Sequence, residues 1–110
     1  IVAPLLTIFP INKSKLTQEA RVNIGFFAQK LKSSGSNVNY VVITGYADKG
    51  TGSIKRNETL SKERAQAVYD CLTKEFGIPE SQLRIDYKGG VNNMYYDNPA
   101  LSRATVTQAE

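Results

Sequence analysis

The sequence contains no histidine and no tryptophan, and its 110 residues include a single cysteine. Without histidine the chain lacks the commonest general base and the commonest zinc ligand. One cysteine, Cys71, excludes an intrachain disulfide framework and a cysteine-rich metal cluster. No apolar run approaches the ~20 residues that a membrane-spanning helix needs. These absences exclude most metal and thiol chemistry, and we expect neither a metal nor a cofactor.

What is present is the composition of one globular domain. Apolar residues make up 41% of the chain and charged residues 22%, which argues against disorder. Basic residues exceed acidic ones by 14 to 10, a net charge of +4. This is weak evidence for nucleic-acid binding, which is associated with a clustered basic stripe. Because residue 1 is isoleucine and not methionine, we expect residues 1–110 to be one domain cut from a longer protein.

The first half of the chain predicts a strand, a helix and a second strand. The short apolar run at residues 5–9 is typical of a strand, and Thr17 is a good N-cap for a helix. Apolar residues then recur three or four positions apart as far as Leu31, and the Ser-, Gly- and Asn-rich stretch 33–37 ends the helix. Residues 40–44 are continuously apolar and β-branched, as in a central strand covered on both faces.

The second half predicts another helix followed by two strands. Ser61 is expected to cap the helix, and Gly77 stands just past its end. Residues 83–87 alternate between apolar and polar and predict a third strand, and residues 104–107 predict a short last strand. Helices between strands imply crossovers and some parallel pairing. We therefore predict an α/β fold: a two-layer βαβαββ sandwich whose small mixed sheet has helices packed on one face.

The stretch between the second strand and the second helix is the best candidate for a binding site. Ligands of α/β units bind at the carboxyl ends of strands, near helix N-termini. Asp48 follows the most hydrophobic strand, and Arg64 lies one turn into the expected helix. A carboxylate can bind an ammonium group and a guanidinium can bind a carboxylate, so the two exposed side chains would suit a zwitterion such as an amino-acid head group. Alternatively, Asp48 and Arg64 pair with each other, or Asp48 caps a turn.

Several motifs of the chain follow the pattern of one known family. Residues 43–48 read ITGYAD where the family has V-x-G-H-T-D, and residues 60–68 read LSKERAQAV where it has L-S-x-x-R-A-x-A-V. The match extends over nearly the whole chain through shorter elements at residues 9–12, 57, 77–78 and 102–103. The element at residues 60–68, placed after a Gly-x-x-Asp loop, is a specific signal. On these motifs the chain resembles the OmpA-like peptidoglycan-binding domain.

The resemblance implies non-covalent binding of bacterial cell-wall peptidoglycan, which would anchor an outer-membrane or envelope protein to the wall. By this resemblance, Asp48 holds the ammonium of the diaminopimelate residue of the stem peptide, and Arg64 holds its carboxylate. Asn57 and Arg103 would line the same groove, and Asn12 would border it. The implied location is the periplasmic face of the outer membrane. The parent protein would be attached to that membrane, and a homodimer remains open.

The chain departs from the family pattern beside the expected site. Tyr46-Ala47 stands where the family has His-Thr, which removes a hydroxyl and leaves the backbone N–H of Ala47 for the ligand. The closing motif, usually N-R-R-V, reads SRAT at residues 102–105. These differences affect the detailed contacts and the affinity, but they leave Asp48 and Arg64 in place.

Two functions from other classes are alternatives. A peptidoglycan-modifying enzyme needs an acid/base pair, an activated nucleophile or a metal. Of the scattered acidic residues only Asp48 lies in the candidate site, beside an arginine that would lower its pKa, so we predict no turnover. A nucleic-acid-binding α/β module is the other alternative. Residues 40–43 lack the aromatic pattern of such surfaces, and we expect no nucleic-acid partner.

Other residues have structural interpretations beside functional ones. Asn57 could equally be a turn residue or a helix cap, and an ion pair at the sheet edge is favoured for Arg103 over ligand contact. Tyr95 and Tyr96 are interpreted as loop residues that cover the end of the sheet, with stacking on sugar rings as the alternative. Cys71 is expected to be a small buried apolar residue.

Overall fold

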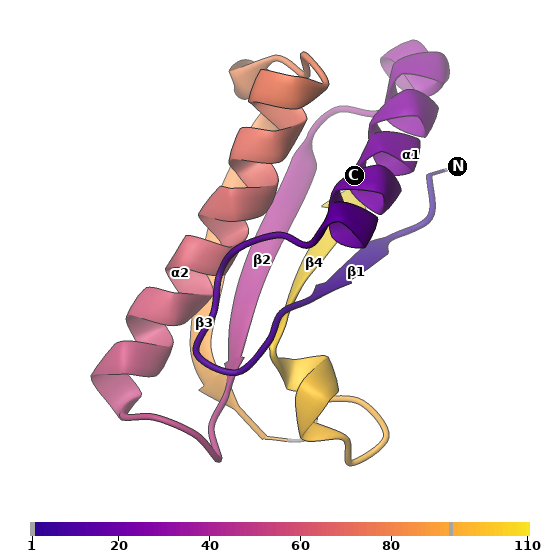
Figure 1. Ribbon diagram of the computed structural model, residues 1–110. Helices are drawn as coiled ribbons and strands as arrows, with labels where there is room; N and C mark the ends of the chain where they lie inside the picture. Colours follow the sequence, from indigo (N-terminus) through magenta and orange to yellow (C-terminus); the bar gives the residue numbers. More distant parts are fainter. Residues whose placement is uncertain (1, 93) are drawn as a thin grey trace.

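The computed structural model describes residues 2–92 and 94–110. Its main elements are β1 (Leu5–Ile8), α1 (Gln18–Ser34), β2 (Val41–Asp48), α2 (Ile54–Asp70), β3 (Leu83–Val91) and β4 (Ala104–Ala109). Four short helical segments are η1 (Gly35–Asn37), η2 (Cys71–Glu75), η3 (Glu80–Gln82) and η4 (Pro99–Ser102). Both long helices lie on the same side of the sheet (Figure 1). The predicted two-layer α/β sandwich is confirmed.

The four strands form a mixed sheet in the order β1-β4-β2-β3. β2 runs parallel to β3 and antiparallel to β4, and β4 runs antiparallel to β1. The central place predicted for the second strand is therefore correct. The expectation that it is covered on both faces is wrong, because burial alternates along β2 and only one face lies under the helices.

α1 begins and ends as its sequence predicts. The Thr17 Oγ1 accepts a hydrogen bond from the Ala20 N–H at 3.0 Å, which makes Thr17 the N-cap. The helix ends at Gly35, whose φ of +56° is readily adopted only by a residue without a side chain. Its buried face consists of Ile24, Phe27, Ala28 and Leu31.

α2 begins earlier than predicted. Ser53, not Ser61, is the N-cap, since its Oγ accepts a hydrogen bond from the Arg56 N–H at 3.0 Å. Ser61 is buried inside the helix, where its Oγ donates to the Glu58 carbonyl and accepts from the Gly89 N–H at 3.0 Å. The far end is as predicted: after the π-helical turn η2, Gly77 adopts a φ of +69° and the helix stops.

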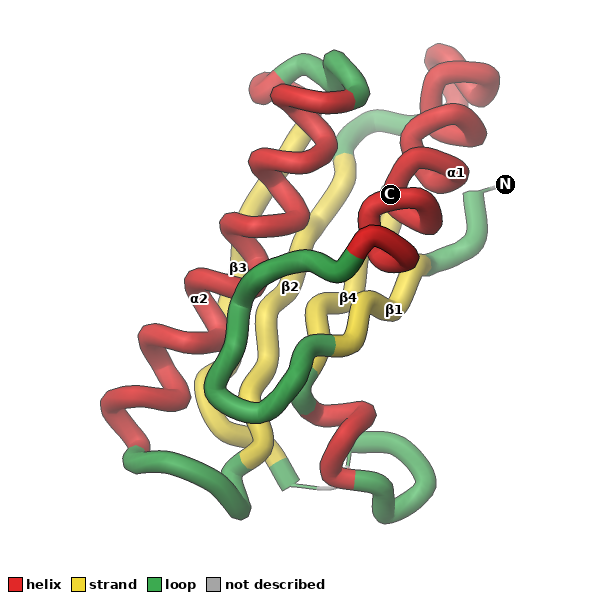
Figure 2. The backbone as a smooth tube through the Cα atoms, in the orientation of Figure 1, coloured by secondary structure: helices red, strands yellow, loops and turns green. Residues whose placement is uncertain are grey.

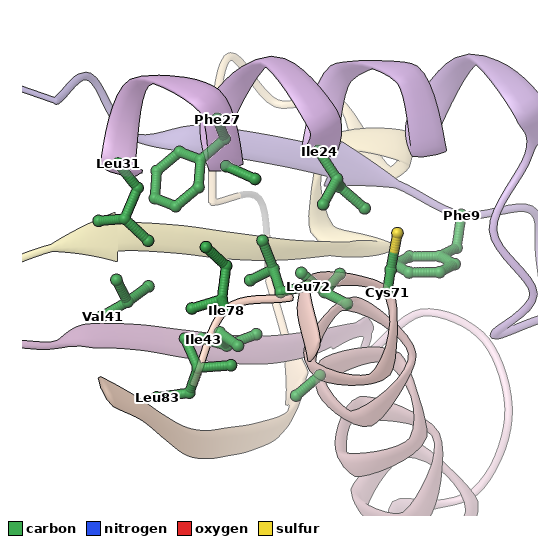
Figure 3. Packing of buried hydrophobic residues seen from close by; sticks show 13 residues of the cluster. Phe9, Ile24, Phe27, Leu31, Val41, Ile43, Cys71, Leu72, Ile78 and Leu83 are labelled. Atoms are coloured by element: carbon green, nitrogen blue, oxygen red, sulfur yellow. The ribbon is translucent and has the colours of Figure 1, made fainter. Parts of the chain in front are cut away.

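The hydrophobic core lies between the sheet and the two helices. Figure 3 shows side chains from α1, β2 and η2 meeting there, with Leu72 and Ile78 between the layers. Several members, among them Ile24, Ile43 and Leu72, have no exposed surface. Burying a side chain of this size stabilises the fold by about 1.5–3 kcal/mol.

α2 lies against β2 at Gly45 without room for a side chain. A Cβ atom at this glycine would lie 1.8 Å from the Ser61 carbonyl oxygen, closer than any real contact. The helix backbone therefore rests directly on the strand, which fixes where the polar residues on the first half of α2 meet the end of β2.

Candidate functional site

Asp48, the last residue of β2, is only 8% exposed. Its Oδ1 accepts a hydrogen bond from the Gly50 N–H at 3.0 Å, which closes a tight turn. Its Oδ2 accepts no hydrogen bond from the described residues, and none of their Lys or Arg side chains forms an ion pair with it. The turn-capping alternative is therefore confirmed for one carboxylate oxygen, and the other oxygen is unused.

Arg64 is completely buried, so the expectation of an exposed guanidinium is wrong. Nε donates to the Lys13 carbonyl at 2.9 Å, Nη1 to the Tyr46 carbonyl at 3.0 Å, and Nη2 to the Pro10 carbonyl at 3.1 Å. The guanidinium also lies over the ring of Phe9, 5.4 Å from its centroid. Three of its five N–H groups are thus used, all by neutral acceptors.

Among the described residues, the charge of Arg64 has no partner of opposite sign. No carboxylate of residues 2–92 or 94–110 forms an ion pair with it, so Asp48 and Arg64 do not pair with each other. Burial, together with the like charges of Arg103 and Arg56, lowers the pKa of Arg64 to about 10. The side chain is still a cation at neutral pH, and a buried cation without an anion is costly unless its hydrogen bonds are satisfied.

The cover over Arg64 is the loop of residues 10–16 between β1 and α1, which we call the strap. Figure 2 shows this loop passing in front of β2 toward α2 before it turns back into α1. Its tip is Asn12, with a φ of +57°, and the Asn12 Oδ1 accepts a hydrogen bond from the Arg56 Nε at 2.9 Å. The strap is therefore held by two arginines of α2, one on its backbone and one on its tip.

An irregularity in β2 directs the Tyr46 carbonyl toward Arg64. The register with β3 shifts between Gly45 and Ala47, so Tyr46 has no paired position in the ladder. Ala47, whose N–H was expected to face the ligand, is fully buried opposite Gly90 within the sheet. The departure from the family pattern at residues 46–47 thus falls on the bulge.

Asn57 lies beneath the loop that joins β2 to α2. Its side chain is 4% exposed, and its Nδ2 donates to the Thr51 carbonyl at 2.8 Å and to the Asp48 carbonyl at 3.4 Å. Gly90 passes so close that a Cβ there would lie 3.1 Å from the Asn57 Nδ2. Asn57 therefore supports the loop that shapes the surroundings of Asp48.

Arg103 joins η4 to β4 at the same end of the sheet. Its carbonyl accepts a hydrogen bond from the Phe9 N–H at 2.7 Å, and its Nε is buried without a hydrogen-bond partner. The ion pair expected at this residue is not formed with any described acidic side chain. Arg103 therefore adds a second cation near Arg64 without an anion to balance it.

Comparison with known proteins now decides the family. The model of the OmpA family matches residues 8–107. The chain belongs to the OmpA family. Outer membrane protein 40 of Porphyromonas gingivalis is 30% identical over 110 residues, which are all of this chain and 28% of that protein. Four matching curated relatives are covered over 21% to 34% of their length, so this OmpA domain spans about a third of their length or less.

Solved structures support the same assignment. An OmpA-like domain from Francisella tularensis superposes with a TM-score of 0.79 at 26% identity, over 96% of this chain and 71% of that one. The peptidoglycan-associated lipoprotein of Burkholderia pseudomallei has a TM-score of 0.73 at 20% identity, over 94% of this chain and 86% of that one. The second likeness concerns the fold alone.

In this OmpA domain the residues expected to form the site meet at one end of the sheet. Asp48 and the carbonyl that binds Arg64 are two residues apart on β2, about 7 Å along a strand. Sequence reasoning missed the acceptors of Arg64, which are backbone carbonyls and have no sequence signature. Within the described residues no helix is long and apolar enough to span a membrane, and no cluster of potential metal ligands occurs.

Proposed function

We propose that this domain binds bacterial peptidoglycan non-covalently, with Asp48 accepting hydrogen bonds from the ammonium group of diaminopimelate in the stem peptide. The observation that carries the proposal is a pair of opposite charges, each almost or fully buried, that are paired neither with each other nor with other described residues. A zwitterionic head group would neutralise both. Such charge-assisted hydrogen bonds contribute about 1.5–3 kcal/mol each.

The buried position of Arg64 makes the strap part of the proposed binding step. The ligand carboxylate reaches the guanidinium only when the carbonyls of Pro10 and Lys13 move away. A carboxylate is a stronger acceptor than the neutral carbonyls that it replaces, so the exchange is favourable. In the unliganded domain the same carbonyls keep the buried cation solvated.

We further propose that binding anchors an envelope protein on the periplasmic face of the outer membrane, without turnover of the wall. The relatives named outer membrane proteins support the location. The absence of histidine from the sequence and the single carboxylate at the site support binding over hydrolysis. Release of soluble fragments from purified wall sacculi by this domain would contradict the proposal.

The test compares Asp48→Asn with Asp70→Asn, a matched change at the last residue of α2. Asp48→Asn is expected to abolish co-sedimentation with sacculi, because it removes the charge that binds the ammonium. Asp70→Asn is expected to bind like the wild type. Diaminopimelate at ten times its Kd should stabilise the wild type by about 1.4 kcal/mol and leave Asp48→Asn unchanged. Sedimentation of Asp48→Asn at wild-type levels would overturn the assignment.

Arg64→Lys examines the other half of the site. Lysine keeps the positive charge but cannot present a planar fork, so we expect weaker binding together with a less stable strap. Thermal unfolding without ligand measures the strap, and sedimentation measures the ligand contact. Wild-type affinity in a destabilised Arg64→Lys protein would limit Arg64 to a structural role.

A further inference from the structure

The face of the sheet that turns away from the helices carries apolar side chains on its β1–β4 half. Leu6 and Ile8 are 38% and 45% exposed there, and Leu6 stands opposite Val106 in the register of the two strands. Neither of the two long helices covers this face (Figure 1). The other half, on β3, carries the charged residues Arg84, Asp86 and Lys88.

A hollow of about 360 Å³ lies on the apolar half, where the loop between β3 and β4 rises beside the strands. Leu6, Leu101 and Val106 contribute apolar surface, and Gln108 contributes an amide. The rings of Tyr95 and Tyr96 complete it, and none of its lining residues is charged. The size falls within the range of about 300–1,000 Å³ that is usual for small-molecule sites.

Tyr96 is held outward at a cost in backbone energy. It is 93% exposed, and both Tyr96 and Asp97 adopt left-handed conformations, with φ of +54° and +53°. Each such non-glycine residue costs on the order of 1–2 kcal/mol. The loop is nevertheless ordered by hydrogen bonds from the Asn98 N–H to the Tyr95 carbonyl and from the Ala100 N–H to the Asn98 Oδ1. Strain of this kind persists where the surrounding structure enforces it and is concentrated at functional sites.

We propose that this hollow binds a neutral pyranose ring, with a tyrosine ring against the sugar's C–H face and the Gln108 amide on its hydroxyl groups. A sugar presents an apolar face and polar edges, which matches an uncharged hollow that combines aromatic rings with one amide. A phosphate or a carboxylate would find no cation among the lining residues.

The loop that carries Tyr95 and Tyr96 begins at the same end of the sheet as the charged site, whereas Leu5, Leu6 and Gln108 extend the hollow toward the opposite end. Val91, where the loop to Tyr95 begins, stands opposite Asp48 in the register of β3 and β2. Resting on the proposed function, the inference is that one domain holds the stem peptide at Asp48 and the adjoining sugar of the glycan strand at Tyr96.

The experiment separates the two sites with two probes. One is a trimer of N-acetylglucosamine. The other is a stem peptide in two forms, one with its disaccharide attached and one without it. Tyr96→Ala should abolish trimer binding in an NMR titration and weaken the sugar-bearing peptide about tenfold, while leaving the sugar-free peptide unchanged. Asp48→Asn should lose the sugar-free peptide and keep the trimer. Phe26→Ala, which removes another exposed aromatic ring from α1, is the matched control and should bind every probe normally.

The outcomes are distinguishable. Because Tyr96 is almost fully exposed, Tyr96→Ala is expected to unfold at the wild-type temperature, and Tyr96→Phe should retain the stacking contact. Wild-type binding of both sugar probes by Tyr96→Ala overturns the sugar site and leaves the role of Asp48 intact. A change in self-association on light scattering, without a change in sugar binding, also overturns it and makes the hollow a contact between copies of the chain. Failure of Asp48→Asn to lose the sugar-free peptide counts against the proposed function alone.

Discussion

The helix formed by α2 and η2 buries different kinds of side chain in its two halves. Residues 54–64 bury three polar side chains, Asn57, Ser61 and Arg64, besides Leu60, whereas residues 65–75 bury only the apolar side chains of Ala65, Val68, Cys71 and Leu72. For the apolar half to pack well, its side chains need little more than the right volume. The polar half requires a partner for nearly every donor, and the partners are backbone groups of four separate segments.

Within this one helix, the second half mainly stabilises the fold, whereas the first half mainly positions the candidate site. Apolar contacts around the second half hold the layers together without directing any group. Hydrogen bonds around the first half place the strap, the loop after β2 and the Asp48 carboxylate relative to one another. Changes in the two halves should therefore lower stability by similar amounts, but only changes in the first half should also weaken binding.

The largest effect is expected at Gly45, where the two halves meet. Gly45→Ala places a Cβ atom 1.8 Å from the Ser61 carbonyl, and neither backbone can yield easily. We expect a loss of about 4 kcal/mol, above the usual overpacking penalty. Gly77→Ala is the control, because its added Cβ meets nothing and only the positive φ costs about 1 kcal/mol. Equal urea midpoints for the two variants would refute the close contact.

Leu72→Ala tests the apolar side of the comparison. Leu72 is fully buried in the core, so the lost transfer energy and the remaining cavity should cost about 3 kcal/mol. Sedimentation with sacculi at a temperature where the variant is folded should match the wild type. Loss of binding in a folded Leu72→Ala protein would show that the two halves are coupled.

Asn57→Ala tests the polar side. It removes the donor to the Thr51 carbonyl, while the Asp48 carbonyl keeps the hydrogen bond from the Thr51 N–H, and we expect a cost of about 2 kcal/mol. The loop loses its support at the same time, so binding to sacculi should fall in parallel. Asn39→Ala, at an exposed asparagine, should change stability by less than about 0.5 kcal/mol. Retained binding by Asn57→Ala would mean that the loop does not need this amide.

Cys71 gives the smallest effect and provides a pH test of the apolar half. Burial, assisted by Glu75, raises the pKa of the thiol from 9.0 to about 12. The unfolded chain therefore loses this proton first, and the stability that the protonated thiol provides is present below pH 9 and lost between pH 9 and about 12. At pH 10 the wild type should lose about 1.4 kcal/mol relative to Cys71→Ala. Parallel stability curves for the two proteins from pH 7 to 10 would contradict a buried thiol.

The sequence predicts best those parts that depend on local pattern. Neighbouring residues predict the periodic face of α1 and its cap at Thr17, and both are confirmed. They also predict the end of the second helix at Gly77, which is confirmed as well. The start of α2 was misplaced because Ser53 and Ser61 are equally good capping residues. Only packing against Gly89 and Gly45 distinguishes a serine in the middle of the helix from one at its end.

The sequence predicts where the candidate site lies along the chain, but it does not predict that Arg64 is buried or which groups bind it. Ligands of α/β folds bind at the carboxyl ends of strands, and Asp48 stands at the end of the most hydrophobic strand. The burial of Arg64 depends on carbonyls at Lys13 and Pro10, 51 and 54 positions away along the chain. Backbone acceptors carry no side-chain signature, so the strap that covers Arg64 is visible only in three dimensions.

The strand order has a mechanical consequence. β4 runs antiparallel to both β1 and β2, so the start of β1 lies at the end of the sheet opposite Asp48. A pull between Leu5 and a ligand held at Asp48 would drag β1 lengthwise along β4 and load its four register pairs together. Strands loaded lengthwise must break their hydrogen bonds at once and not one after another. The short edge strand β1 would therefore resist unfolding when the domain is pulled between its N-terminal end and the bound ligand.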